Sequence, residues 1–156
     1  MAAPLLLDTN LLVLLVTGLT NPAYIPKNKR LAAFDEIDFN IVSNIADSAS
    51  KLVFSPNILS ETSNFLRYAW GPVRMETSDT LALLVRTYGE DYVPTHSVLD
   101  IPEFNRLGVT DCVLIVQARS GATLLTDDLD LFLASSSAEQ NAVNYNAYRE
   151  QRPDFR

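Results

Sequence analysis

The sequence predicts an α/β fold in which short buried strands alternate with helices around a central, mainly parallel sheet. Two apolar runs, residues 4–7 and 122–126, have the length of buried strands, and each runs directly into acidic residues. Between them, Phe39, Val42 and Ile45 repeat at helical spacing. Because alternating strands and helices build parallel sheets through right-handed crossovers, we expect one sheet covered by helices on both faces.

The other elements are expected from the same signals of periodicity, capping and chain breaking. In chain order they are a buried helix over 10–16, a loop over 20–29, a helix over 39–49, a strand over 51–54, a helix over 58–69 stopped by Gly71 and Pro72, a helix capped by Thr77 or Ser78, an apolar patch at Tyr92 and Val93, a helix over 111–119, a short helix over 130–134, an edge strand at Val143 and Tyr145, and a polar tail over 149–156.

Length and composition indicate a single globular domain spanning residues 1–156. The chain is 47% hydrophobic and 20% charged, which is ordinary for a globular protein. Its one cysteine, Cys112, excludes an internal disulfide and a cysteine-based zinc site, so a cytoplasmic location is expected. The longest apolar stretch near the N-terminus, residues 5–16, is too short for a membrane span and lacks the basic flank of a signal peptide.

The net charge of −7 argues against a protein that binds nucleic acid by overall electrostatic attraction. This objection weakens if several of the 19 acidic residues gather in one site and bind divalent cations, because such ions invert the local potential. The positions of the acids therefore decide which function is expected.

Acidic residues follow both predicted central strands at the point where each strand ends. Asp8 follows residues 5–7, and Asp127 and Asp128 follow residues 124–126. The carboxyl ends of parallel strands share one edge of the sheet, where open α/β sheets bind their ligands. Glu61 and Asp111 are expected to join this edge from nearby helices. The sequence thus predicts a cluster of carboxylates.

Such a cluster needs a cation or a shared proton, because neighbouring carboxylates repel one another. Mg²⁺ or Mn²⁺ suits hard oxygen ligands, and these ions can activate water for phosphodiester hydrolysis. Each acid also has an ordinary structural interpretation. For Asp111 alone helix capping is favoured, and Asp130 is expected to be solvated, whereas an acid wedged between two apolar runs, as Asp8 is, favours a functional role.

Four motifs occur in order along nearly the whole chain. They are Leu-Leu-Leu-Asp-Thr-Asn at 5–10, Ser-Pro-Asn-Ile-Leu-Ser-Glu at 55–61, Leu-Gly-Val-Thr-Asp at 107–111 and Leu-Leu-Thr-Asp-Asp at 124–128. Together they resemble the PIN-domain family. The resemblance implies a three-layer α/β/α sandwich and a Mg²⁺- or Mn²⁺-dependent ribonuclease that cuts single-stranded or exposed RNA. Many members of that family are toxins of toxin–antitoxin pairs.

The resemblance also assigns roles to individual residues. Asp8, Glu61 and Asp111 match the acids that hold metal or its water, and Asp128 matches the fourth acid. Asp127 is an additional acid that could share this fourth role. Two polar residues, Asn10 and Thr126, match positions that support the acids by hydrogen bonds. An antitoxin protein and a homodimer are candidate partners besides RNA.

The chain is longer between residues 17 and 50 than compact members of that family, which suggests a helical or loop insertion there. This segment contains Lys27, Lys29 and Arg30, which could contact phosphates, although a short basic run is more often a solvated surface. The same two interpretations apply to Arg67, Arg74 and Arg86. Trp70 and the tyrosines could stack on bases, although packing is their commoner use.

Rival functions lack residues that they require. A phospho-accepting receiver module needs a lysine late in the chain, but none follows Lys51. A haloacid-dehalogenase-like phosphatase needs a second acid two residues after the first, where this chain has Asn10. The lone His96 offers no histidine-based metal site, and Cys112 is expected to be a core residue. The remaining alternative is a non-catalytic PIN-fold module that binds RNA or a protein.

Overall fold

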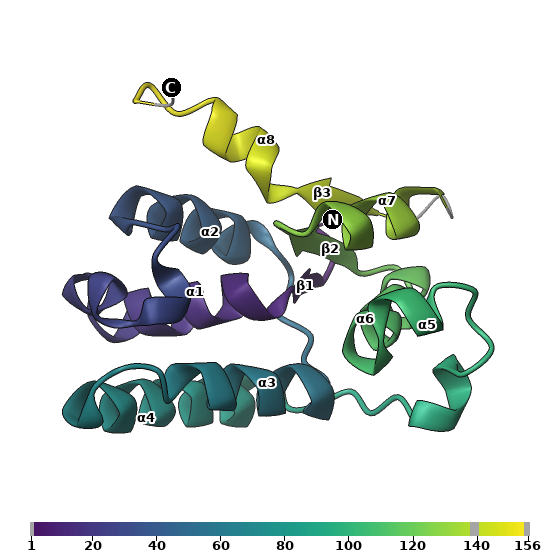
Figure 1. The fold of residues 1–156 in the computed structure, drawn as a ribbon, viewed down its shortest axis with the longest axis horizontal. Helices are drawn as coiled ribbons and strands as arrows, with labels where there is room; N and C mark the ends of the chain where they lie inside the picture. Colours follow the sequence, from purple (N-terminus) through teal and green to yellow (C-terminus); the bar gives the residue numbers. More distant parts are fainter. Residues whose placement is uncertain (1, 138–140, 155–156) are drawn as a thin grey trace.

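The computed structural model describes residues 2–137 and 141–154 and has a mixed α/β fold. Within these residues the sheet contains β1 (Leu5–Leu7), β2 (Thr123–Thr126) and β3 (Ala142–Asn144), in the order β1-β2-β3 (Figure 1). Both pairings are parallel, with Leu6 opposite Leu124 and Leu125 opposite Val143. The expected parallel sheet is confirmed, and the carboxyl ends of β1 and β2 lie side by side.

The predicted strand over residues 51–54 is reduced to a single parallel bridge on the outer edge of β1. Leu52 pairs with Leu5, whose backbone N–H donates to Lys51 O at 2.9 Å. The pairing stops early because Ser55 already caps the next helix, its hydroxyl accepting the Ile58 N–H at 3.1 Å.

Helix α1 (Thr9–Thr20) starts directly after β1 and is buried along most of its length. It contacts α2 (Glu36–Ser48), α3 (Pro56–Leu66) and α4 (Gly71–Tyr88), which surround it (Figure 1). Because neighbours cover several of its sides, the helix is apolar all round rather than striped. The prediction of a buried helix after β1 is confirmed, and the helix is longer than expected.

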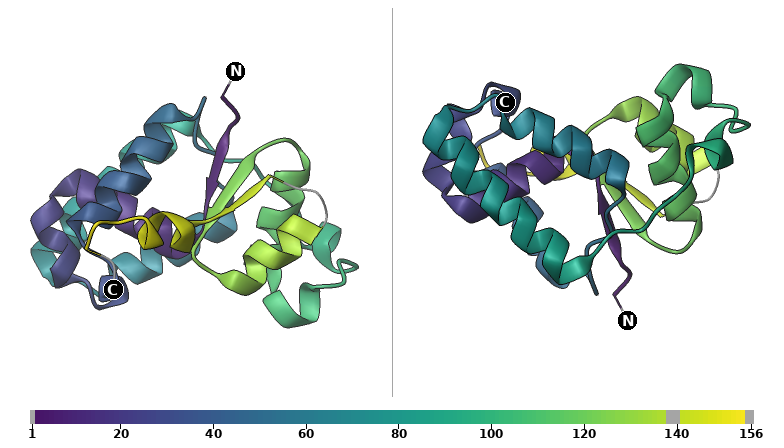
Figure 2. Two further views of the ribbon diagram at one scale, coloured as in Figure 1. Left: turned by 90° about the horizontal axis from the view of Figure 1, so that it is seen from above. Right: turned by 90° about the horizontal axis from the view of Figure 1, so that it is seen from below.

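Three of the later helices lie across the strands from this group. Helix α6 (Val109–Arg119) contacts β1 and β2, and α7 (Leu129–Ser137) contacts β2 and β3. Figure 2 shows α5 (Phe104–Leu107), α6 and α7 on the opposite side of the strands from α1–α4. The shorter elements are η1 (Pro22–Lys27), η2 (Lys29–Leu31), η3 (Thr95–Val98) and α8 (Tyr145–Glu150).

Two sequence expectations are wrong. Helix α4 begins at Gly71 and not near Thr77 or Ser78, because Pro72 falls in its first turn, where the missing N–H of proline is not needed. Tyr145 is the first residue of α8 and not part of an edge strand. Helix α8 also replaces the first part of the expected polar tail, whose last two residues lie outside the described part of the chain.

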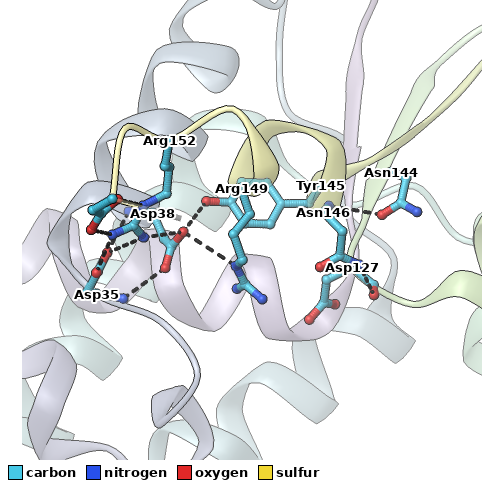
Figure 3. A network of polar contacts seen from close by, with 9 residues as sticks. Asp35, Asp38, Asp127, Asn144, Tyr145, Asn146, Arg149 and Arg152 are labelled. Carbon is cyan, nitrogen blue, oxygen red and sulfur yellow. Dashed lines mark hydrogen bonds and ion pairs between the residues drawn. The ribbon is translucent and has the colours of Figure 1, made fainter. Parts of the chain in front are cut away.

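The residues after β3 are anchored on the start of α2 by a buried polar network (Figure 3). Arg152 donates to both carboxylate oxygens of Asp35, at 2.9 and 2.7 Å, and pairs with the buried Asp38 at 3.1 Å. The hydroxyl of the fully buried Tyr145 donates to Asp38 at 2.6 Å. Asp35 and Asp38 also cap α2 reciprocally. Tyr145 and Arg152 therefore attach the segment after β3 to α2.

No helix in the described part of the chain is long and apolar enough to cross a membrane.

We predict that Arg152→Gln lowers the free energy of unfolding by about 2–4 kcal/mol, because it removes the closest cation from a buried carboxylate. Urea denaturation measures the change. The matched control is Arg106→Gln, since Arg106 pairs with Asp130 at 3.7 Å on the open surface. That control should cost no more than about 0.5 kcal/mol. Equal effects of the two substitutions would contradict a stabilising role for the network.

We predict that Gly18→Ala destabilises the protein by roughly 1–3 kcal/mol, because the added methyl group overpacks the contact between α1 and α2. A Cβ atom at Gly18 would lie 2.1 Å from Cδ1 of the buried Phe39. The matched control is Gly71→Ala, where the nearest atom would be 3.9 Å away. Thermal unfolding should show a lower Tm for Gly18→Ala alone.

Candidate metal centre

Asp8 is held at the carboxyl end of β1 by hydrogen bonds of both its backbone and its side chain. Its N–H donates to Leu125 O at 3.1 Å, which continues the β1–β2 pairing by one residue. Its side chain caps α1 by accepting the Asn10 N–H at 3.2 Å, and its other carboxylate oxygen accepts the Thr126 hydroxyl. The strand end and the helix start thus give this carboxylate a defined position.

Asp127 lies against Asp8. The two carboxyl groups lie close enough for their charges to interact, and such a pair favours sharing one proton over carrying two negative charges. Burial, followed by the charge of Asp127, raises the pKa of Asp8 to about 7. Burial also raises the pKa of Asp127, although the nearby Arg149 opposes this shift. Near neutral pH this acid pair therefore holds a proton that an ordinary aspartate would have lost.

Asp111 brings a third acid from the first turn of α6. Burial raises its pKa to about 6, with further contributions from the charges of Asp128 and Glu61. In the described residues Asp111 makes no side-chain capping bond, because Gly108 occupies the N-cap position of α6. The capping role that the sequence favoured for Asp111 is therefore wrong, and its carboxylate is available to the site.

Glu61 projects from the second turn of α3 toward the start of α1. The Thr9 hydroxyl donates to its carboxylate at 3.3 Å, and Thr9 directly follows Asp8. This contact links α3 to the strand end that carries Asp8. Glu61 therefore approaches the acids from the side of the site formed by α1 and α3.

Asp127 and Asp128 are neighbours in sequence, but their side chains have different partners. Asp127 contacts Asp8, whereas the exposed Asp128 caps α7 by accepting the Leu131 N–H at 3.2 Å. The Thr126 hydroxyl links the two sides, donating to Asp8 and accepting the Asp128 N–H at 3.0 Å. The sequence left open which of the two is the fourth acid, and the structure gives the two residues different partners.

The donor set has the chemistry that Mg²⁺ and Mn²⁺ prefer, since every acid supplies hard carboxylate oxygens. In the ranges 2–137 and 141–154, however, no three His, Cys, Asp or Glu side chains stand close enough together to hold one ion. Arg149 is a nearby cation, and Figure 3 shows its side chain between Asp38 and Asp127. The residues fit a divalent cation in chemistry, while their side chains are spread along the sheet edge.

Asp130, Cys112 and His96 were expected to have ordinary structural roles, and their positions agree with this expectation. Asp130 is exposed and pairs with Arg106, and Cys112 is buried in the core. His96 lies on the surface in η3.

Two arginines beside the acids were not assigned to the site from the sequence. Arg30 donates to Asn10 at 3.2 Å, and Arg149 reaches Asp127 from α8. The basic run around Arg30 was a visible signal. Nothing in the sequence marked Arg149, whose place depends on tertiary packing such as the 3.1 Å bond from Asn146 to Asp127 O (Figure 3).

No protein-family model, curated protein or solved structure gives a significant match to this chain. The interpretation of the site therefore depends on the chain's own residues.

We predict that Asp8→Asn stabilises the metal-free protein above pH 7. The folded state holds the Asp8 proton up to a pKa of about 7, against an ordinary value of 3.8, so wild-type stability falls as the pH rises between these values. The variant lacks this loss and should gain about 1–3 kcal/mol at pH 8 relative to wild type. Thermal unfolding in EDTA at pH 5 and pH 8 measures it.

The matched control is Asp130→Asn, which changes an exposed acid. Its difference from wild type should not depend on pH. An Asp8→Asn protein whose difference from wild type is the same at both pH values would contradict the raised pKa.

Proposed function

We propose that this chain is a Mg²⁺- or Mn²⁺-dependent endoribonuclease with a PIN-like fold that cuts single-stranded or exposed RNA in the cytoplasm. The observation that carries the proposal is the half-buried acid pair of Asp8 and Asp127, flanked by Asp111, Asp128 and Glu61, at the carboxyl edge of β1 and β2.

A comparison of the half-buried Asp8 with the buried Asp38 supports a functional role for this pair. Asp38 is buried beside Arg152 and Arg149 and receives the Tyr145 hydroxyl, so its charge is compensated. Asp8 has a hydroxyl, a backbone N–H and another acid as neighbours. An under-compensated acid lowers stability, and groups perturbed in this way concentrate at functional sites.

The arrangement of the four motifs also supports a PIN-like fold. Their segments lie at the β1–α1 junction, in the first half of α3, at the start of α6 and at the β2–α7 junction. Their acids interact although the segments are far apart in sequence. We extend the observed α/β fold to a three-layer α/β/α arrangement as part of the same proposal.

In this mechanism Asp8, Asp127, Asp111 and Glu61 would supply the carboxylate ligands, with the exposed Asp128 beside them, and binding of a divalent cation would require their side chains to move closer together. When bound, Mg²⁺ or Mn²⁺ supplies charge neutralisation at the phosphodiester and activation of water. Thr126 and the Asn10 N–H fix the two oxygens of the Asp8 carboxylate. The proton shared by Asp8 and Asp127 must leave for both carboxylates to act as ligands, so activity should increase between about pH 6 and pH 8.

We predict that the purified protein cleaves a single-stranded RNA in the presence of Mn²⁺ and that Asp8→Asn reduces the rate by at least about 100-fold, as for loss of a direct ligand. Asp127→Asn should have a larger effect than Asp128→Asn, because only Asp127 contacts Asp8. Fluorescent RNA separated on denaturing gels gives the rates.

The matched control is Asp130→Asn, which should cleave at the wild-type rate. Two results would sink the nuclease proposal. One is the absence of cleavage by wild type at enzyme excess with either ion. The other is equal cleavage by wild type and Asp8→Asn, which would indicate a contaminating nuclease.

A second candidate is a PIN-fold module that binds RNA or a protein without cutting. It is favoured by the spread of the acids, since no three acidic side chains in the described residues stand close enough to hold one ion. In that case the wild type would bind RNA but cleave nothing. A toxin role, an antitoxin partner and a homodimer are further proposals that rest on the motif resemblance.

A further inference from the structure

Two surface segments that are distant in sequence lie side by side next to the acidic site. Asn28 forms an antiparallel bridge with Ala69, and its side-chain amide donates to Phe65 O at 3.1 Å. The bridge aligns the basic residues of the first segment with exposed aromatic residues of the second. We call this the basic–aromatic surface; it consists of Lys27, Lys29, Arg30, Tyr68 and Trp70.

Arg30 is the member of this surface that reaches the acidic site. Its guanidinium carbon lies 3.9 Å from the centre of the Phe65 ring, and Nη2 donates to Asn10 Oδ1 at 3.2 Å. The backbone N–H of Asn10 in turn donates to Asp8 at 3.2 Å. Two contacts thus hold an exposed arginine beside the acids, and its remaining N–H groups face solvent.

The cations of this surface form no ion pairs with carboxylates of the described residues. Across residues 2–137 and 141–154, none of Lys27, Lys29 and Arg30 forms an ion pair. Lys27 instead lies 5.5 Å from the centre of the Tyr24 ring. Three cations without acidic partners therefore lie close together in sequence, in a chain of net charge −7.

The aromatic side chains of this surface are as open as its cations. Tyr68 is 55% exposed and Trp70 is 71% exposed, although large apolar side chains gain most by burial. Exposed aromatic rings beside cations are the combination that binds single-stranded nucleic acid, since bases stack on the rings and phosphates contact the cations.

We propose that the basic–aromatic surface binds the single-stranded RNA that enters the acidic site, with Arg30 holding a backbone phosphate and Trp70 stacking on a base. This inference rests on the proposed function for its substrate class. It explains how an acidic protein holds an anionic polymer: the acids face the cleaved phosphodiester, and local cations hold the flanking phosphate. A protein partner would be a different occupant, and the experiment below separates the two.

The test measures binding of a fluorescent single-stranded RNA by anisotropy, with Asp8→Asn as the background so that cleavage does not interfere. Arg30→Gln should weaken binding roughly tenfold and reduce the slope of log K against log salt by about 0.7, the value for one lost phosphate contact. Trp70→Ala should weaken binding about five- to tenfold with little change in slope, as for one lost stacking contact.

Each substitution has a matched control outside the surface. Arg119→Gln removes an exposed arginine from the end of α6, near the start of β2 and thus at the opposite edge of the sheet from the acids. Tyr92→Ala removes an aromatic side chain with the same 71% exposure as Trp70. Both controls should bind RNA as the background protein does.

A second substitution at Arg30 guards against a folding effect. Arg30→Lys should restore the salt slope while leaving part of the affinity loss, because lysine keeps the charge but not the planar contact with Phe65. Each protein is first checked for an unchanged Tm. If Arg30→Gln has a lowered Tm, Lys29→Gln, which removes a neighbouring exposed cation of the same surface, replaces it for the comparison of slopes.

The outcomes separate this inference from the proposed function. The inference is overturned if Arg30→Gln binds RNA as well as Arg119→Gln does, or if Trp70→Ala binds it as well as Tyr92→Ala does. This result would leave a protein as the partner of the surface, and it would count against the inference even if the wild type cleaves RNA. Selective loss in Arg30→Gln and Trp70→Ala supports it, even if the wild type fails to cleave, in which case only the nuclease proposal falls.

Discussion

The parallel pairing of β1 with β2 determines where Asp8, Asp127 and Asp128 lie. It continues one residue beyond β1, through the bond from the Asp8 N–H to Leu125 O, and is joined by the Thr126 hydroxyl on the Asp8 side chain. Because β2 ends one residue later, Asp127 leaves the sheet next to Asp8. A shift of one residue in this register would turn alternate side chains to the other face and separate the two carboxyl groups.

The two acidic centres, the buried Asp38 and the half-buried pair of Asp8 and Asp127, differ in how their charge is compensated. At the Asp38 centre, arginines and a tyrosine hydroxyl compensate the charge, and the result is an anchor that joins the chain end to α2. At the Asp8 centre, acid lies against acid, and burial holds a proton that solvent would remove. The first arrangement adds stability, and the second reduces it in the absence of a cation. That difference is why a catalytic role is assigned to Asp8 and not to Asp38.

Apolar runs, helical periodicity and chain-breaking residues predicted most of the helices and strands. The positions that the sequence did not predict depend mainly on contacts between segments that are distant in the chain. The strand ends at Asp8 and Thr126 were visible because apolar runs stop there, and so was the helix that carries Asp111. The start of α4 was missed because Gly71 and Pro72 break a helix interior but are compatible with a helix start. The positions of Arg30 and Arg149 followed from packing between distant segments, which composition and periodicity do not record. The sequence also could not divide Asp127 from Asp128, since their partners differ only in three dimensions.

The central claim is that the acids at the edge of β1 and β2 form a divalent-cation site. Direct titration of the purified protein with Mn²⁺, followed by the loss of the free-ion signal in electron paramagnetic resonance, tests it without RNA or turnover. The account predicts saturable binding by the wild type, competition by Mg²⁺, release of protons on binding because carboxyl groups must ionise, and loss of binding in Asp8→Asn. Wild-type protein that leaves all Mn²⁺ free at pH 8, or that binds it as well as Asp8→Asn does, would contradict the account.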